Sequence, residues 1–189
     1  MKHQWFSALF LLLLLCACHG NDEKQIAEQQ KDAKAKELIF RNISNGWHFA
    51  KPGLNPTTQS MIQNWNEMRE FTHELYEIPK SSISAFQKKA KDLSRKAREL
   101  NNNIPPAFNK PQVKSRISAL VTRINSINLF INLDAIPEQK ILALISEVDV
   151  TMVSLYAQMD EIVRKNQIPI EEGESDMIRM LDTSRAIPN

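Results

Sequence analysis

The stretch PQVKSRISALVTRINSINLFINLDAIPEQKILALISEVDVTMVSLYAQMDEIVRKN, residues 111–166, decides the fold. Its apolar side chains recur in alternating steps of three and four residues, the period of helices that pack along one seam. A break around Asp134 and Pro137 divides the pattern into predicted helices over 111–133 and 137–166. The two seams consist of Val113, Ile117, Leu120, Ile124, Ile127 and Ile131, and of Ile141, Ile145, Val148, Met152, Leu155, Met159 and Ile162. Folding back at the break places Ile131 opposite Ile141, so the pattern predicts an antiparallel αα-hairpin.

A second pair of helices is predicted upstream, over 58–77 and 82–100. Their seams are Met61, Trp65, Met68, Thr72 and Leu75, and Ile83, Phe86, Ala90, Leu93, Ala97 and Leu100. Pro79 interrupts the run, and Ser82 is a suitable N-cap for the second helix. An alternative is one long helix kinked at Pro79. Two hairpins predict an all-α fold, an up-down-up-down four-helix bundle with an N-terminal linker and a short C-terminal helical tail.

The flanking segments carry weaker patterns. Residues 19–37 are rich in Gln, Lys, Glu and Ala without a sustained apolar stripe, which predicts a polar linker that is helical at most in part. Residues 38–56 are predicted to be irregular, either with a small hairpin turn at Asn45-Gly46 or with aromatic side chains packed on the bundle. At the other end, Ser175 can cap the short helical tail. That tail presents Met177, Ile178 and Leu181.

The N-terminal segment has the features of a bacterial export signal. Lys2 precedes an apolar run from Trp5 to Cys18. As a helix this run would measure ~21 Å, too short to cross a hydrocarbon core of ~30 Å. It ends in Leu15-Cys16-Ala17-Cys18, which resembles the lipobox of bacterial lipoproteins, with an apolar residue three before the cysteine and a small residue directly before it.

The resemblance implies that residues 1–17 are a signal peptide and that Cys18 is the lipidated N-terminus, carrying a diacylglyceryl group and an amide-linked acyl chain such as palmitate. Residue 19 is a histidine and not the aspartate that is associated with inner-membrane retention. The resemblance therefore implies the outer membrane of a Gram-negative bacterium, with the domain either in the periplasm or outside the cell. Residues 18–37 are then the lipidated linker, and residues 38–189 are the helical domain with its tail. The alternative is an ordinary secretory signal with two incidental cysteines.

Composition and motifs exclude several kinds of site. With 4 glycines among 189 residues, the chain has no glycine-rich phosphate loop. Glu70 and His73 match the Glu-x-x-His spacing of di-iron bundles, but those sites need a second such motif, which is missing. We therefore predict no metal, no cofactor and no catalytic residue. The glutamates of this helix are expected to face water, away from its seam: Glu67, Glu70, Glu74 and Glu77.

Charge is unevenly distributed along the chain, although the formal net charge is only +2. Residues 80–133 carry 11 basic and 2 acidic residues, whereas residues 134–189 carry 5 and 11. A basic stripe lies on the outer side of the 82–100 helix and comprises Lys88, Lys91, Arg95 and Arg98. Lys89 and Lys96 are expected beside this stripe. It is either a solvated face or a docking site for an anionic partner, such as phospholipid headgroups, lipopolysaccharide or an acidic protein.

Asn125, Asn128 and Asn132 flank the seam of the 111–133 helix, where they either fix helix register or form a ligand-facing row of amides. Together these features predict a non-enzymatic binding or scaffolding module attached to the membrane by its lipid anchor. Nucleic acid is not expected as a partner in this compartment. The alternatives are an immunity or inhibitor protein for an envelope enzyme and a cofactor-binding helical bundle.

Overall fold

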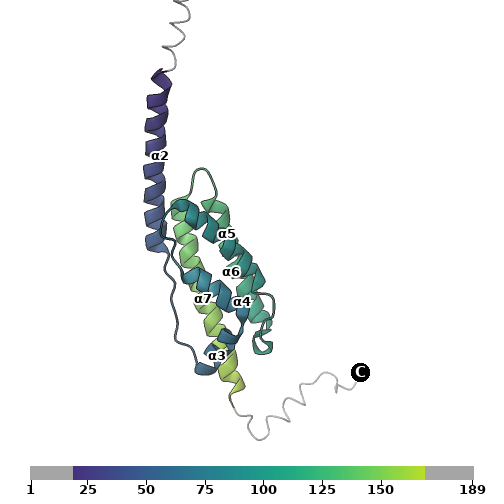
Figure 1. Cartoon of the computed structure of the whole chain (residues 1–189). Coiled ribbons are helices and arrows are strands. Elements are labelled where there is room, and N and C mark those ends of the chain that lie inside the picture. The colour runs from purple at the N-terminus through teal and green to yellow at the C-terminus, as the bar shows by residue number, and fades with distance from the viewer. Residues whose placement is uncertain (1–18, 169–189) are drawn as a thin grey trace, which may run out of the picture.

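The computed structural model describes residues 19–168, and within this range the chain is all-α, as predicted. This part contains six α-helices, one short 3₁₀ helix and no strand. The helices are α2 (His19–Gly46), α3 (Pro56–Asn64), α4 (Asn66–Tyr76), α5 (Ile83–Glu99), α6 (Pro111–Ile131) and α7 (Glu138–Asn166), with η1 (Pro106–Phe108) before α6. Figure 1 shows α4 to α7 gathered together and α2 extending beyond them. The predicted signal peptide, Cys18 and the predicted C-terminal tail lie outside the described residues.

The apolar seams of α5, α6 and α7 form the core. Every seam residue predicted for α5 and α6, from Ile83 to Ile131, is buried. On α7 the predicted seam is buried from Ile141 to Met159, and in the last turn Val163 rather than Ile162 lies inside. The alternating steps of three and four residues therefore locate the buried faces of these three helices, because side chains spaced in this way share one side of a helix.

The ends of these helices follow the local sequence. Ser82 caps α5, where its hydroxyl accepts a hydrogen bond from the backbone N–H of Ala85 at 3.4 Å. Pro111 occupies the first turn of α6, where the missing N–H costs little. The N-cap position of α7 is Pro137, which offers no side-chain hydrogen bond.

The helix predicted over 58–77 is in fact two helices, because the backbone leaves helical geometry at Trp65 (φ −89°, ψ 99°). The indole of Trp65 is 1% exposed, and its Nε1 donates to the carbonyl of Asn102 in the α5–α6 loop at 3.3 Å. Phe71 joins Trp65 in the core in place of Thr72, and Met61 is only half-buried. The break thus lets a large aromatic side chain pack beneath the loop, and regular helical hydrogen bonds are lost at this point. Sequence periodicity does not predict such a break.

The segment predicted to be a linker and an irregular stretch is largely one helix, α2, of 28 residues. Residues 24–38 are exposed, and only the last turns contact the other helices, through Ile39, Phe40 and Ile43. Asn45 and Gly46 end this helix and form no hairpin. Ala, Gln, Lys and Glu are strong helix formers, so α2 is helical without the apolar stripe on which the prediction depended.

Gly46 permits a close approach between α2 and α7. A Cβ atom at this position would lie 2.6 Å from Cδ2 of Leu142 on α7, closer than real carbon atoms come. At the present separation of the two helices, a side chain at position 46 would require Leu142 to move. Asn42, one turn earlier, donates to Oε1 of Glu138 at 3.0 Å and fixes the same junction.

Residues 47–55 connect α2 to α3 and run along α7, where two carboxylates hold their backbone. Oδ1 of Asp149 accepts from the N–H of Ala50 at 2.7 Å. Oδ1 of Asp160 accepts from the N–H of Asn55 and from the hydroxyl of Thr58, both at 2.9 Å. These bonds supply the partners that a connection without secondary structure would otherwise need from water.

Helix α7 is long and apolar enough to cross a membrane, judged by length and composition alone. The central helix of a water-soluble bundle meets the same criterion when its apolar side is buried. In α7 the seam is buried, and Glu147 and Asp149 lie near its middle. Its composition therefore gives no reason to place it in a bilayer.

Trp47 provides a test of the junction between α2 and the core. Its indole is 2% exposed, packs edge-on against Phe49, and donates from Nε1 to the carbonyl of Leu75 at 2.8 Å. Trp47→Ala should lower the free energy of unfolding by about 3–5 kcal/mol, as expected for a buried aromatic side chain. Trp47→Phe should leave the buried carbonyl of Leu75 without its donor and cost about 1–3 kcal/mol.

Urea unfolding followed by circular dichroism measures both effects. Ile26→Ala is the control, because Ile26 is 53% exposed on the free part of α2, and it should change stability by less than about 0.5 kcal/mol. If Trp47→Ala were as stable as this control, α2 would not belong to the cooperative unit.

Candidate functional site

The four side chains of the basic stripe, Lys88, Lys91, Arg95 and Arg98, are all exposed on α5. Arg95 forms an ion pair with Glu99 one turn later, at 2.9 Å between Nη1 and Oε1. Lys88 and Lys91 form neither an ion pair nor a hydrogen bond with any residue in the 19–168 range. Ammonium groups left without internal partners remain available to an external anion.

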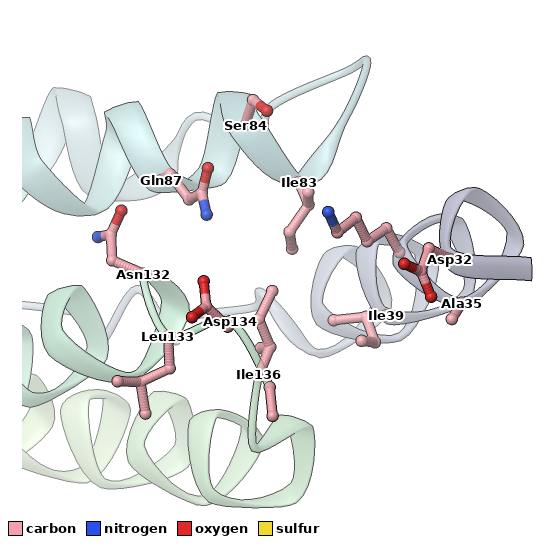
Figure 2. Close-up of a pocket in the computed structure, with 12 residues that line it drawn as sticks. Asp32, Ala35, Ile39, Ile83, Ser84, Gln87, Asn132, Leu133, Asp134 and Ile136 are labelled. Carbon is pink, nitrogen blue, oxygen red and sulfur yellow. The ribbon is translucent and has the colours of Figure 1, made fainter. Parts of the chain in front are cut away.

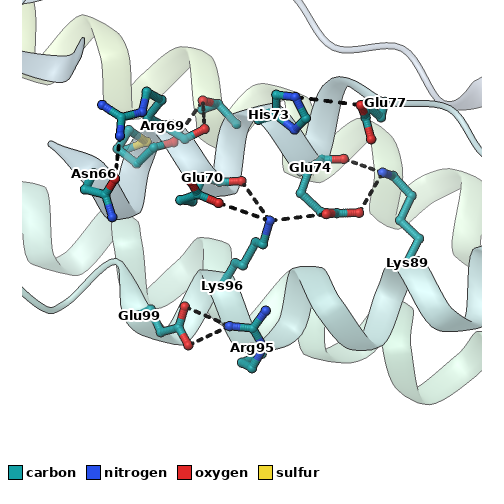
Figure 3. Close-up of polar contacts among 12 residues, drawn as sticks. Asn66, Arg69, Glu70, His73, Glu74, Glu77, Lys89, Arg95, Lys96 and Glu99 are labelled. Carbon is teal, nitrogen blue, oxygen red and sulfur yellow. Dashed lines mark hydrogen bonds and ion pairs between the residues drawn. The ribbon is translucent and has the colours of Figure 1, made fainter. Parts of the chain in front are cut away.

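Lys89 and Lys96, predicted to lie beside the basic stripe, instead turn toward α4 (Figure 3). Lys89 is 6% exposed, and its Nζ donates both to the backbone carbonyl of Glu74 and to the carboxylate of Glu74, the latter at 3.1 Å. Lys96 Nζ lies 3.3 Å from Oε2 of Glu74 and 3.6 Å from Oε2 of Glu70. These two lysines are therefore part of the α4–α5 interface and not of the outer surface.

The expectation that all four glutamates of α4 face water is wrong for Glu74. Its side chain is 21% exposed and lies between the two lysines, whereas Glu77 is 62% exposed and, among the described residues, pairs only with His73, at 3.7 Å. Desolvation raises the pKa of the Glu74 carboxyl, but hydrogen bonds and charge attraction from Lys89, and then from Lys96, outweigh it. The net result is a pKa below the ordinary value, so Glu74 is ionised at neutral pH.

On its other side, α5 adjoins the amides of α6. The hydroxyl of Ser94, which is 4% exposed, donates to Oδ1 of Asn125 at 2.6 Å. Nη1 of Arg98 donates to the same oxygen at 3.3 Å and to the hydroxyl of Ser94 at 2.7 Å. Nearer the start of α5, Gln87 donates to the carbonyl of Ile131 at 3.0 Å. Amide and hydroxyl groups, rather than ion pairs, therefore join α5 to α6.

A cavity of about 590 Å³ opens where α2 passes the start of α5 and the α6–α7 loop. Figure 2 shows Gln87, Asn132 and Asp134 facing one another across it, with Asp32 on the α2 side. Its walls also include Lys36 and several isoleucines. The sequence does not predict this cavity, because one wall belongs to the segment expected to be a linker. Its two carboxylates oppose an anionic ligand, so the cavity does not extend the chemistry of the basic stripe.

The residues considered for metal binding lie on the surface. His73 is 71% exposed on α4, and its only ionic neighbour within the described chain is Glu77. In residues 19–168 no group of three or more His, Cys, Asp or Glu side chains is placed to hold a metal ion.

Among the buried titratable groups, desolvation raises the pKa of Tyr156 well above its ordinary value, so this phenol is neutral at physiological pH.

Acidification tests the role of Glu74. Because its pKa is lower in the folded protein than in the unfolded chain, its ion pairs contribute fully above the ordinary value of 4.5. Their contribution is lost as the pH falls through the lower folded value. Glu74→Gln should remove this part of the pH dependence and lower stability at neutral pH by about 1–3 kcal/mol, the range for hydrogen bonds to charged groups.

Urea unfolding at several pH values measures this effect. Glu77→Gln removes the same charge from an exposed position on the same helix, and it should leave stability at neutral pH nearly unchanged. Equal losses in the two variants would show that the Glu74 cluster does not join α4 to α5.

Comparisons with known proteins add no relative from which a role could be transferred. No protein family, curated protein or solved structure matches this chain. The residues of its own surface are therefore the basis for assigning a function.

Proposed function

We propose that this protein is a lipid-anchored component of the bacterial cell envelope that acts as a non-enzymatic binding or scaffolding module. The basic stripe of α5 is its binding surface, and the partner is anionic. The observation that carries the proposal is the pair Lys88 and Lys91, exposed and without internal partners in the described part of the chain. They stand on a helix whose core-facing side is already filled by apolar residues.

The proposed anchor is Cys18, with the acyl chains in the outer membrane. The lipobox-like residues 15–18 support it, and α2 begins at the next residue. The exposed residues 24–38 of this helix extend about 22 Å at the rise of an α-helix. In this proposal α2 is a stiff spacer that holds the helical domain away from the lipid surface.

We further propose that α3 to α7 form an up-down-up-down bundle of two αα-hairpins. In this arrangement α3 and α4 together occupy one position of the bundle. Helix α4 packs on α5, α5 on α6, and α6 on α7, and short connections join them. In this chain apolar side chains fill the interior, so the outer faces are the surfaces left for a partner.

Two features of the charge distribution support the basic stripe as the working face. Helix α6, which lies beside it, contains no acidic residue. The two acidic residues of α5 are Asp92 and Glu99. Asp92 and Lys88 both line the hollow between α5 and α4, so Asp92 does not lie on the side of α5 that meets α6. Positive charge is thus left unbalanced over one face, which attracts anions at distances up to about a Debye length.

The anchor is tested by Cys18→Ala in the full chain expressed in a Gram-negative bacterium. The wild-type protein should partition into the detergent phase and incorporate radiolabelled palmitate. The Cys18→Ala variant should lose both properties, because several acyl chains are needed for stable anchoring. Cys16→Ala is the matched control and should behave as wild type. Unchanged partitioning of the Cys18 variant would contradict the anchor.

The binding surface is tested by replacing Lys88, Lys91, Arg95 and Arg98 together by Gln. This variant should elute from a heparin column at clearly lower salt than the wild type, while its melting temperature stays within a few degrees, since exposed charges contribute little to stability. The control removes four positive charges from the exposed part of α2: Lys24, Lys31, Lys34 and Lys36. Equal elution shifts in the two variants would show that total charge, and not the basic stripe, governs binding.

A further inference from the structure

The face formed by α5 and α6 combines the cations of the basic stripe with a row of side-chain amides. The contacts Ser94–Asn125 and Gln87–Ile131 fix an antiparallel register between the two helices. Lys91 lies midway between Ser94 and Gln87 on α5, and Asn128 lies midway between their partners on α6. The register therefore places Lys91 level with Asn128.

The hydrogen bonds within this face engage its amide acceptors and leave its donors free. Oδ1 of Asn125 already accepts from Ser94 and Arg98. Oδ1 of Asn128 accepts from Nδ2 of Asn132 at 3.3 Å. The Nδ2 groups of Asn125 and Asn128 donate to no residue in the described range. Both side chains are half-buried, so part of each remains accessible to an external acceptor.

A surface that offers mainly donors favours a ligand rich in acceptors. Lys91 supplies positive charge, the two asparagines supply neutral N–H groups, and no carboxylate of α6 competes with them. Lys88 lies toward α4, where it shares a hollow with Glu74, Glu77 and Asp92. The complementary ligand has carboxylates for the cations and, between them, regularly spaced neutral acceptors for the amides. An extended peptide with acidic side chains has this combination, because every residue also carries a backbone carbonyl.

Other anionic ligands fit this face less well. A membrane surface is bound more strongly when apolar side chains also enter the lipid, and Leu129 is the one large apolar residue of α5 and α6 that is strongly exposed. Single-stranded nucleic acid is typically bound by aromatic side chains on which its bases stack. The aromatic residues of α5 and α6 do not supply them, since Phe86 is 1% exposed and Phe130 is covered by Lys140.

We infer that the α5–α6 face binds an extended acidic segment of a partner protein, with Asn125 and Asn128 donating to its backbone and Lys91 pairing with one of its carboxylates. This inference rests on the proposed function and specifies the partner of the same surface. It also gives a role to the amide row that the basic stripe alone does not explain.

The test measures binding of a fluorescein-labelled oligoglutamate peptide to the full chain in detergent, by fluorescence anisotropy. Asn128→Ala removes the free donor without changing charge and should weaken binding about threefold, and Asn128→Asp, which also repels the carboxylates, should weaken it about tenfold. The matched controls are Asn64→Ala and Asn64→Asp, because Asn64 is an exposed amide at the end of α3. Both controls should bind within about twofold of the wild type, and circular dichroism should show all four variants folded.

Competition identifies the class of ligand. Unlabelled oligoglutamate should displace the labelled peptide at lower concentrations of charge than polygalacturonate or vesicles that contain phosphatidylglycerol. The inference would be overturned if polygalacturonate or the vesicles displaced the labelled peptide at lower concentrations of charge than oligoglutamate does. It would also be overturned if the wild type did not bind oligoglutamate.

The variants also separate this inference from the proposed function. If the four-Gln variant of the basic stripe loses the peptide but the Asn128 variants bind like the Asn64 controls, the amide row has no role and the inference fails while the proposed function stands. If the four-Gln variant binds the peptide and heparin as strongly as the wild type, both fail.

Discussion

Close packing of the apolar seams on α5, α6 and α7 is the constraint on which the rest of the structure depends. Residues 19–168 contain no cysteine, so no disulfide holds this part of the chain, and stability comes from buried apolar surface at ~25 cal/mol per Å². One side of each of these helices is buried in the core. Polar contacts then decide which outer faces adjoin: Lys89 with Glu74 joins α5 to α4, and Ser94 with Asn125 joins α5 to α6. The surface available to a partner is what these two sets of contacts leave free.

The sequence predicts those parts of the fold that depend on a periodic apolar pattern. The seams of α5, α6 and α7 repeat in steps of three and four residues, and their buried faces follow from that spacing alone. The sequence predicts helix α2 only in part, because a helix that is polar on all sides has helix propensity but no periodic apolar pattern. The break at Trp65 was missed for the opposite reason, since Trp65 keeps the periodic spacing although its backbone is extended. Such a break depends on a loop that packs over the indole, and the loop is distant in sequence.

The candidate site, like the fold, could be predicted from the sequence only in part. The exposure of Lys88, Lys91, Arg95 and Arg98 could be predicted, because each lies opposite the seam of its own helix. The positions of Lys89, Lys96 and Glu74 could not, because a helical wheel gives the direction of a side chain but not the neighbour that a long side chain reaches. The amides of α6 were recognisable as a group. Which of their atoms are engaged, and which are free, becomes apparent only when α5 is placed beside them.

Gly46 has a mechanical consequence. The exposed residues 24–38 of α2 extend about 22 Å beyond the roughly 12 Å, residues 39–46, that packs on the other helices, so a displacement at the base is amplified about twofold at residue 24. The contact at Gly46, where Leu142 occupies the space of a missing side chain, lies within that base. A methyl group there would meet the end of the Leu142 side chain, which would have to move for α2 and α7 to keep their separation. The direction of α2 therefore depends on this contact together with the hydrogen bond between Asn42 and Glu138 at the same base.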